Sequence, residues 1–366
     1  MLLALNRDTK IYVAGHHGLV GSAIWRSLEQ KGYVNLVGRS HSELDLMDPL
    51  AVKDFFDSEK PEVVILAAAL VGGIMANSTR PADFIFQNLQ IQQDVIGEAF
   101  RHEVKKLLFL GSTCIYPRLA AQPMSEECLL TSALEPTNEP YALSKIAGLK
   151  MCEAFNRQYA TNYIAVMPTN LYGPNDNFDL IGSHVLPAIV RKVHLAKCIM
   201  EGDDEALLRD IAHRPLKDNV SATSSEADVK SILASRYSIF DSHLSLWGSG
   251  TPLREFLWSE DMADACVYML EHVDVDGGDL LSDTGVRISN CSFVNVGTGI
   301  EHTIGQVARM VADVVGYRGE IRFDASKPDG TPRKLTNPSR LHALGWRHKI
   351  ELEDGIRQLY KWYLEN

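Results

Sequence analysis

Short apolar runs alternate with longer amphipathic stretches from Lys10 to about residue 112, and this alternation limits the fold more than any other feature of the chain. Short apolar runs indicate buried strands, and stretches with helical periodicity indicate helices between them. The expected strands are IYVAG, VNLVG, VVILAAA and KLLFLGS; the expected helices are SAIWRSLEQKG, PLAVKDFFDSEK and NLQIQQDVIGEAFRH. Strands that alternate with helices pair in parallel through right-handed crossovers. The sequence therefore predicts an α/β fold with a doubly wound parallel sheet, whose ligand lies at the carboxyl ends of the strands.

A glycine-rich turn, GHHGLVG, follows the first expected strand and opens the first expected helix. In this context Gly15 permits a tight turn, Gly18 lets the backbone approach a pyrophosphate, and Gly21 allows contact between helix and strand. The free N–H groups at the start of the helix favour an anion. The pattern predicts a Rossmann-type dinucleotide site, against the alternative of glycines that only shape a turn.

The end of the second expected strand distinguishes NAD from NADP. NAD-binding domains usually carry Asp or Glu there to accept the ribose hydroxyls. This chain has Arg39 at that place and no acid until Glu43. Because a cation favours the 2′-phosphate, we expect NADPH; the alternative is that Arg39 is a solvated loop residue.

The stretch NEPYALSKIAG supplies Tyr141 and Lys145, which are four residues apart and share one face of an expected helix. The ammonium is expected to lower the pKa of the phenol toward the range of an acid/base catalyst. Ser112 and Cys114 lie in a stretch expected to be extended, so their side chains point to the same side. Ser112 then bonds the carbonyl that Tyr141 protonates. The alternatives are a serine that satisfies backbone groups and a cysteine that is a small buried hydrophobe.

The chain is expected to have an NADP-binding domain at 8–174, to which a segment near 255–300 returns. A smaller substrate-binding region is expected at 175–254 and 300–366, where proline, glycine and polar residues are common. The polar stretch near 197–243 carries no motif, so we expect a surface insertion without catalytic duty.

The composition limits the partners and the compartment. A net charge of −11 argues against nucleic acid as the main partner, because phosphate backbones are held mainly by Lys and Arg. The six cysteines form no CxxC pair and no zinc-ligand spacing, so we expect reduced thiols in a cytoplasmic protein and no metal site. Neither a secretory signal nor a membrane helix is expected.

Several longer strings resemble the GDP-L-fucose synthase family of extended short-chain dehydrogenases/reductases. They are GSTCIYP, LEPTNEPYALSKIAG, VMPTNLYGPNDNF, SHVLPAIVRK, LWGSGTPLREFL, NVGTG and FDASKPDGTPRKL. The resemblance runs from about Lys10 to Asn366, apart from the insertion. It implies an NADPH-dependent enzyme, usually a homodimer, that converts GDP-4-dehydro-6-deoxy-D-mannose to GDP-L-fucose. The reaction comprises epimerisation at C3 and C5 and reduction at C4.

The resemblance also implies roles for single residues. Tyr141 is then the proton donor in reduction, Lys145 its helper and Ser112 the carbonyl partner, whereas Cys114 and His184 are the acid/base pair of epimerisation. The expected cofactor contacts are Gly15, His17, Gly18, Leu19, Val20, Gly21, Arg39, Leu110, Gly111, Ser112, Tyr141, Lys145, Pro168, Thr169, Asn170, Leu171 and His184. The expected substrate contacts are Lys192, Trp247, Arg254 and Asp329.

Two departures from the family pattern remove positive charge. His17 stands where Arg is common, and Leu70 stands where relatives often carry Lys; the loss of either charge weakens the expected phosphate contacts.

Three other functions stay open. A GDP-colitose-type 5-epimerase/4-reductase, or another GDP-4-keto-sugar epimerase-reductase such as a heptose enzyme, would use the same residues. A UDP-sugar 4-epimerase is disfavoured, because it keeps NAD bound whereas Arg39 points to NADPH. A non-catalytic NADPH-binding protein does not explain why all the expected catalytic residues are present.

Overall fold

The computed structural model describes residues 5–216, 225–327 and 329–366. The chain divides into two compact units. The first unit comprises Met1–Asn175, Glu255–Ile300 and Leu335–Lys349; the second comprises Asp176–Arg254, Glu301–Lys334 and Ile350–Asn366. Residues 335–349, expected in the substrate-binding region, thus belong to the first unit, because Leu341, Leu344 and Trp346 are buried in its core.

The core of the first unit is a six-stranded parallel sheet, as the alternating pattern predicted. Its strand order is β2-β1-β3-β4-β5-β12. The strands are β1 (Ile11–Ala14), β2 (Leu36–Val37), β3 (Val63–Leu66), β4 (Lys106–Leu110), β5 (Tyr163–Pro168) and β12 (Phe293–Val296). All neighbours pair in parallel. Every residue of β1, β3, β4, β5 and β12 is buried, which explains why these strands are continuous apolar runs.

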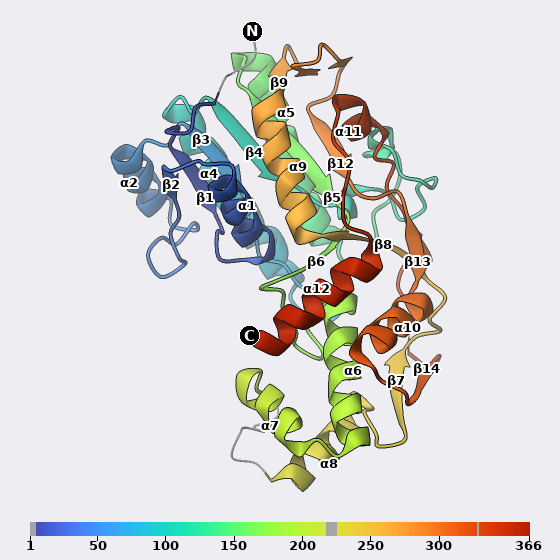
Figure 1. Cartoon of the computed structure of the whole chain (residues 1–366). Helices are drawn as coiled ribbons and strands as arrows, with labels where there is room; N and C mark the ends of the chain where they lie inside the picture. The colour runs from blue at the N-terminus through green and yellow to red at the C-terminus, as the bar shows by residue number, and fades with distance from the viewer. Residues whose placement is uncertain (1–4, 217–224, 328) are drawn as a thin grey trace. The chain divides into compact units, whose positions relative to one another are not determined.

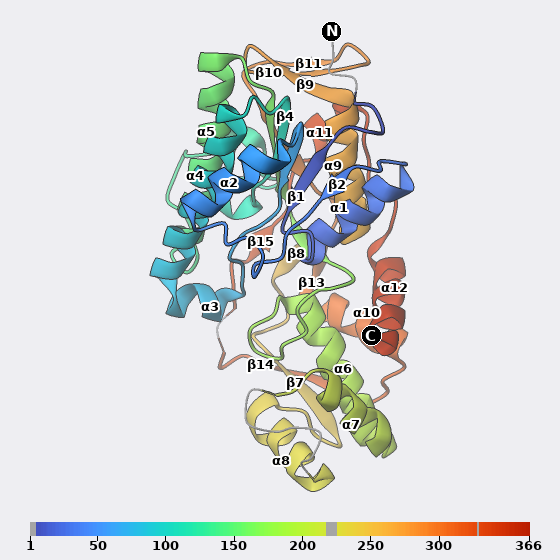
Figure 2. The same cartoon turned by 90° about the vertical axis from the view of Figure 1, so that its left-hand side faces the viewer.

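Helices cover both faces of this sheet (Figures 1 and 2). On one face α1 (Leu19–Gln30) packs against α9 (Ser259–His272). On the other face α4 (Pro81–Arg101) packs against α2 (Pro49–Glu59) and α5 (Glu139–Tyr159). Helix α4 begins earlier than the sequence suggested, because a proline fits its first position.

Shorter elements complete the first unit. They are α3 (Ile74–Thr79), the 3-10 helices η1 (Thr113–Ile115) and η2 (Glu126–Cys128), β6 (Asn170–Tyr172), α11 (Ser339–Leu344), and the antiparallel strands β9 (Val273–Asp276), β10 (Asp279–Ser282) and β11 (Arg287–Ile288). Strand β6 pairs in parallel with the later part of β8 (Leu253–Trp258).

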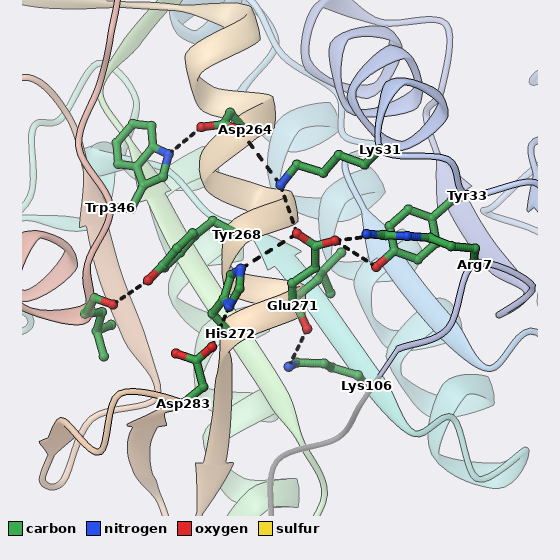
Figure 3. A network of polar contacts seen from close by, with 12 residues as sticks. Arg7, Lys31, Tyr33, Lys106, Asp264, Tyr268, Glu271, His272, Asp283 and Trp346 are labelled. Atoms are coloured by element: carbon green, nitrogen blue, oxygen red, sulfur yellow. Dashed lines mark hydrogen bonds and ion pairs between the residues drawn. The ribbon is translucent and has the colours of Figure 1, made fainter.

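A carboxylate near the end of α9 ties several segments together where the parallel strands begin (Figure 3). Glu271 accepts hydrogen bonds from Arg7 at 2.9 Å, Lys31 at 2.9 Å and Tyr33 at 3.0 Å. Burial alone would raise the pKa of Glu271, but these donors more than offset it and hold the pKa below its usual value. The network fastens α9 to the residues before β1 and after α1.

The second unit contains helices and short strands. They are α6 (Val185–Glu201), α7 (Asp204–His213), α8 (Glu226–Tyr237), β7 (His243–Trp247), β13 (Glu301–Thr303), α10 (Ile304–Val315), β14 (Glu320–Asp324), β15 (Arg333–Lys334) and α12 (Leu352–Glu365). Strand β14 pairs in parallel with β7, and α6 packs against α10.

The described part of the segment near 197–243, where a surface insertion was expected, packs one face of its helices into the second unit. Helices α7 and α8 bury apolar side chains, and Asp210 of α7 is only 4% exposed. Its carboxylate pairs with Arg191 of α6 at 2.9 Å and accepts a hydrogen bond from Tyr363 of α12. The segment is therefore packed into the second unit; residues 217–224 lie outside the described part of the chain.

Among the described residues, none of the helices combines the length and the apolar character that a membrane span requires.

Candidate active site

The glycine-rich turn has the tight geometry that its sequence predicts. Gly15 has φ +83°, and a Cβ on Gly21 would lie 2.0 Å from the Gly15 carbonyl oxygen, so both positions require glycine. Gly18 precedes α1 without a side-chain cap, which leaves the first N–H groups of the helix available to an anion. Leu19 and Val20 form the first positions of that helix. These residues fit a dinucleotide pyrophosphate.

Two histidines occupy the middle of this turn. The ring centroids of His16 and His17 lie 3.9 Å apart, and His16 also contacts Trp25 of α1. A Cβ on Gly38 would lie 2.6 Å from the His16 ring, so His16 packs against the chain that leaves β2. The side chain of His17 is exposed.

Arg39 follows β2, where the sequence predicted it, but the structure gives it a partner. Its guanidinium donates to Glu59 at the end of α2 at 2.5 Å and to the Gly38 carbonyl at 2.7 Å. Because arginine has five N–H donors, the pair with Glu59 leaves donors for a phosphate. Arg39 is thus oriented by an acid rather than solvated.

The chain turns sharply after β4, and the prediction of an extended stretch there is wrong. Ser112 caps a 3-10 helix and accepts a hydrogen bond from the Cys114 N–H at 3.2 Å. The hydroxyl replaces a backbone partner, which favours the turn over a straight strand. Before it, Gly111 packs against Met167, whose sulfur would lie 2.3 Å from an added Cβ. Leu110 ends β4.

Helix α5 places Lys145 beneath this turn. Its ammonium donates to the Leu110 carbonyl at 2.8 Å and lies 5.8 Å from the centroid of the Tyr141 ring. The side chain is only 2% exposed. Burial disfavours the charged form and lowers the pKa of Lys145 to about 7. An additional hydrogen-bond acceptor would therefore stabilise the charged form of Lys145.

The expected lowering of the Tyr141 pKa is wrong. Burial raises the pKa of the phenol, the neighbouring Cys114 raises it further, and a hydrogen bond with Ser112 offsets only part of the rise. Desolvation by burial is the largest of these effects. A phenol that retains its proton is suited to donate it. Tyr141 and Ser112 thus offer two hydroxyls that are able to donate to a ligand oxygen.

Cys114 has a partner that sequence reasoning missed. The side-chain amide of Asn138 donates to the Cys114 sulfur at 3.2 Å. Asn138 stands at the N-cap of α5, three residues before Tyr141. Its position as an N-cap asparagine was the only available signal.

Of the expected cofactor contacts, Pro168 ends β5, and Thr169, Asn170 and Leu171 follow it. Asn170 donates to the backbone carbonyl of Glu255 at 2.8 Å, and Thr169 donates to it at 3.4 Å. The Glu255 carboxylate is fully buried and accepts from the Gly299 N–H and from Thr336. The segment is thus fixed to β8 by side-chain bonds.

The expected substrate residues lie in the second unit. Lys192 is 5.8 Å from the centroid of the half-exposed Trp247 ring, and burial lowers its pKa to about 8. Asp329 accepts hydrogen bonds from the Ser249 hydroxyl at 2.7 Å and from the Ser249 N–H at 2.9 Å. These two bonds, with a smaller effect of Arg254, lower the pKa of Asp329. The Lys192 ammonium thus lies over the Trp247 ring, and Arg254 interacts electrostatically with Asp329.

His184 also belongs to the second unit. It is the N-cap of α6, and its side chain is exposed. Its catalytic and cofactor-contacting roles stay predictions.

Comparison with known proteins shows the class. The model of the NAD dependent epimerase/dehydratase family matches residues 11–222 and 219–281, and the chain belongs to this family.

Particular relatives are similar over nearly the whole chain. A GDP-L-fucose synthase of Escherichia coli (strain K12) is 49% identical over 98% of this chain and 97% of its own length. GDP-L-fucose synthase 1 of Arabidopsis thaliana is 48% identical over 99% and 95%, respectively. A solved GDP-D-glycero-L-gluco-heptose synthase from Campylobacter jejuni, in the presence of NADPH, is 40% identical. That alignment covers 98% of this chain and 99% of the other, with a TM-score of 0.87.

Proposed function

We propose that the protein is an NADPH-dependent GDP-L-fucose synthase, which epimerises GDP-4-dehydro-6-deoxy-α-D-mannose at C3 and C5 and reduces C4 to give GDP-β-L-fucose. The observation that carries this proposal is the grouping of Tyr141 and Lys145, four residues apart on α5, with Ser112 and Cys114 at the carboxyl end of β4. Relatives of this name share 48–49% of the sequence.

The residues at the end of β4 suit a ketone. Two hydroxyls that converge on one oxygen stabilise negative charge on it, both when a neighbouring carbon loses a proton and when the carbonyl is reduced. Tyr141 then gives its proton to the C4 oxygen. We assign Lys145, whose ammonium donates to the Leu110 carbonyl at the end of β4, to the ribose of the cofactor. NADPH, when bound, supplies the hydride.

The cofactor residues fit a phosphorylated dinucleotide. The uncapped start of α1 favours the pyrophosphate, and Arg39 offers a cation at the end of β2 for the 2′-phosphate. Because His17 replaces a common Arg, we expect Arg39 to supply most of the positive charge there.

Epimerisation needs groups that remove and return protons on C3 and C5. The C4 ketone acidifies both hydrogens, so a base of modest strength suffices while Ser112 and Tyr141 stabilise the enolate oxygen. We assign this acid/base work to Cys114 and His184. Full exchange of the C3 and C5 hydrogens with deuterated water in Cys114→Ser and His184→Gln variants would contradict the assignment.

The expected substrate residues of the second unit fit a nucleoside diphosphate best. Lys192 and Arg254 supply positive charge, Trp247 offers an exposed aromatic face, and Asp329 offers a carboxylate to donors of the ligand.

A second candidate is reduction of a GDP-linked 4-keto heptose, which the 40% identical Campylobacter jejuni enzyme favours. Incubation with NADPH and each sugar nucleotide, followed by NMR of the product, separates the two. We expect GDP-L-fucose from GDP-4-dehydro-6-deoxy-mannose; turnover of the heptose substrate alone would replace the first proposal with the second.

We also propose a cytoplasmic homodimer. The six cysteines are free, which suits a reducing compartment. Helices α4 and α5, which pack together, expose the large side chains Phe86, Leu89, Leu143 and Tyr159. Sedimentation of a Leu89→Glu variant tests this face, with a shift from dimer to monomer expected and an unchanged mass as the contrary result.

A further inference from the structure

Asn138 occupies a position where asparagine normally stabilises a helix. It precedes α5, whose first residue is Glu139, and N-cap asparagines usually accept a hydrogen bond from the backbone of the first turn. In this structure the Asn138 side chain makes no such bond. The residue thus forgoes its ordinary contribution to the helix.

The amide instead turns toward the catalytic turn after β4. Its nitrogen lies 3.2 Å from the Cys114 sulfur, within hydrogen-bond distance for a sulfur acceptor. Its oxygen is buried and has no hydrogen-bond partner among the described residues. Leaving a buried carbonyl unpaired is unfavourable, so the orientation of the amide is not explained by satisfying its oxygen.

Backbone interactions fix the position of Cys114, and the chain next to Asn138 is fixed as well. The Cys114 N–H donates to the Ser112 hydroxyl, which fixes the backbone of the 3-10 helix. The proline at the start of α5 fixes the chain next to Asn138. A short bond between two constrained segments defines where the sulfur lies.

The geometry points to Asn138 as a positioning residue for epimerisation: its amide N–H orients the Cys114 sulfur and stabilises the thiolate form. This inference rests on the proposed function for the role of Cys114 in epimerisation. No proton passes to or from Asn138. When the thiolate takes a proton from a sugar carbon, the carbon electrons move onto the ketone oxygen; return of a proton to that carbon reverses the flow.

Alkylation of Cys114 by iodoacetamide tests the inference without any sugar substrate, because the thiolate is the nucleophile. Rates are followed by mass spectrometry of the Cys114 peptide from pH 6 to 10. In Asn138→Ala we expect the rate at neutral pH to fall about 10-fold or more, the size of a lost hydrogen bond to a charged group. The rate at high pH should approach that of the unaltered protein, since hydroxide then forms the thiolate.

Thr137→Ala is the matched control on the same loop, since the Thr137 hydroxyl bonds Glu135 and not Cys114. It should alkylate like the unaltered protein. Asn138→Ser is a second variant that is able to cap α5 but is too short to keep the amide contact; it should fold stably and show the same slow alkylation. Equal or faster alkylation of Cys114 in both folded Asn138 variants would overturn the inference.

The same variants separate this inference from the proposed function. With GDP-4-dehydro-6-deoxy-mannose, Asn138→Ala should exchange the C3 and C5 hydrogens with solvent about 10-fold or more slowly than the unaltered protein. The exchange rate should recover as pH rises. If alkylation slows but Cys114→Ser retains full exchange, the role of Cys114 fails while the contact with Asn138 stands.

Discussion

Buried charged and polar side chains have different partners at the two ends of the strands in the parallel sheet. We call the end where the strands begin the first edge and the end where they finish the second edge. Where the strands begin, Lys106 donates to two backbone carbonyls and to Asp274. There Glu271 also accepts from three donors (Figure 3). Where the strands end, Lys145 donates a hydrogen bond to the Leu110 carbonyl. There, burial raises the pKa of Tyr141, so the phenol retains its proton.

The contrast shows how one sheet separates stability from chemistry. Fully satisfied polar groups stabilise a fold and have little left to offer a ligand. Groups that keep spare hydrogen-bonding capacity in a dry setting interact strongly with whatever binds. We therefore expect changes at the first edge to alter stability and changes at the second edge to alter activity.

The largest expected effect is on reduction by Tyr141→Phe. Loss of the proton donor should lower kcat/KM for NADPH oxidation about 10³-fold, because positioned acids contribute that order of magnitude. Tyr33→Phe is the matched control, since its hydroxyl bonds Glu271 at the other edge. It should cost about 1 kcal/mol of stability and leave the rate unchanged. A similar rate for both variants would remove the distinction between the edges.

The two buried lysines should respond in opposite directions to methionine. Lys106→Met leaves Asp274 without its ammonium partner and should lower the free energy of unfolding by about 3 kcal/mol or more. Lys145→Met removes a sparsely bonded buried charge, so stability at pH 7 should be unchanged or higher by about 1 kcal/mol, while activity is lost. Urea unfolding measures both.

The lowered pKa of Lys145 predicts the direction in which folding stability changes with pH. Because the Lys145 pKa is lowered to about 7, the unfolded chain holds more protons on this lysine than the folded protein between about pH 7 and 10. Stability from this group should therefore rise with pH across that window in the unaltered protein and not in Lys145→Met. An identical pH slope in both would contradict the lowered pKa.

Arg39→Ser should weaken NADPH binding about 10-fold to 100-fold and leave NADH binding nearly unchanged, since only NADPH carries the 2′-phosphate. Isothermal titration with 2′,5′-ADP and with each dinucleotide measures the difference. Arg101→Ser, which removes an exposed arginine paired with Glu98, is the control and should bind both normally. Equal losses for NADPH and NADH would show that Arg39 acts only through structure.

The smallest expected effect is at Glu271. Its pKa is held below the usual value, so its ion pairs stabilise the fold above about pH 4.3 and lose that effect as pH falls through the folded-state pKa. Glu271→Gln should cost about 1–2 kcal/mol at pH 7 and less at pH 3. Glu353→Gln, an exposed pair with Arg357, should cost less than about 0.5 kcal/mol. A pH-independent loss in Glu271→Gln would mean that packing, not charge, is responsible.

Much of the first unit was predictable because its strands are buried on both sides and therefore read as apolar runs. The spacing of Tyr141 and Lys145 likewise placed both on one helix, since positions four apart share a face. The turn at Ser112 was not predictable from polarity, because a hydroxyl that bonds its own backbone competes with an extended strand.

Features that depend on distant partners could not be found in the sequence alone. Glu59, which orients Arg39, is twenty residues away, and the direction of the Tyr141 pKa depends on burial in the fold. The segment at Asp210 looked like a polar surface insertion because its acid is matched by Arg191 only once α6 and α7 pack.

The most direct test is one incubation of the unaltered protein with NADPH and GDP-4-dehydro-6-deoxy-mannose in deuterated water, with the product analysed by NMR. The account predicts GDP-L-fucose that carries deuterium at C3 and C5, and protium at C4 delivered from the cofactor. A reduced product without deuterium at C3 and C5, or solvent deuterium at C4, would contradict it.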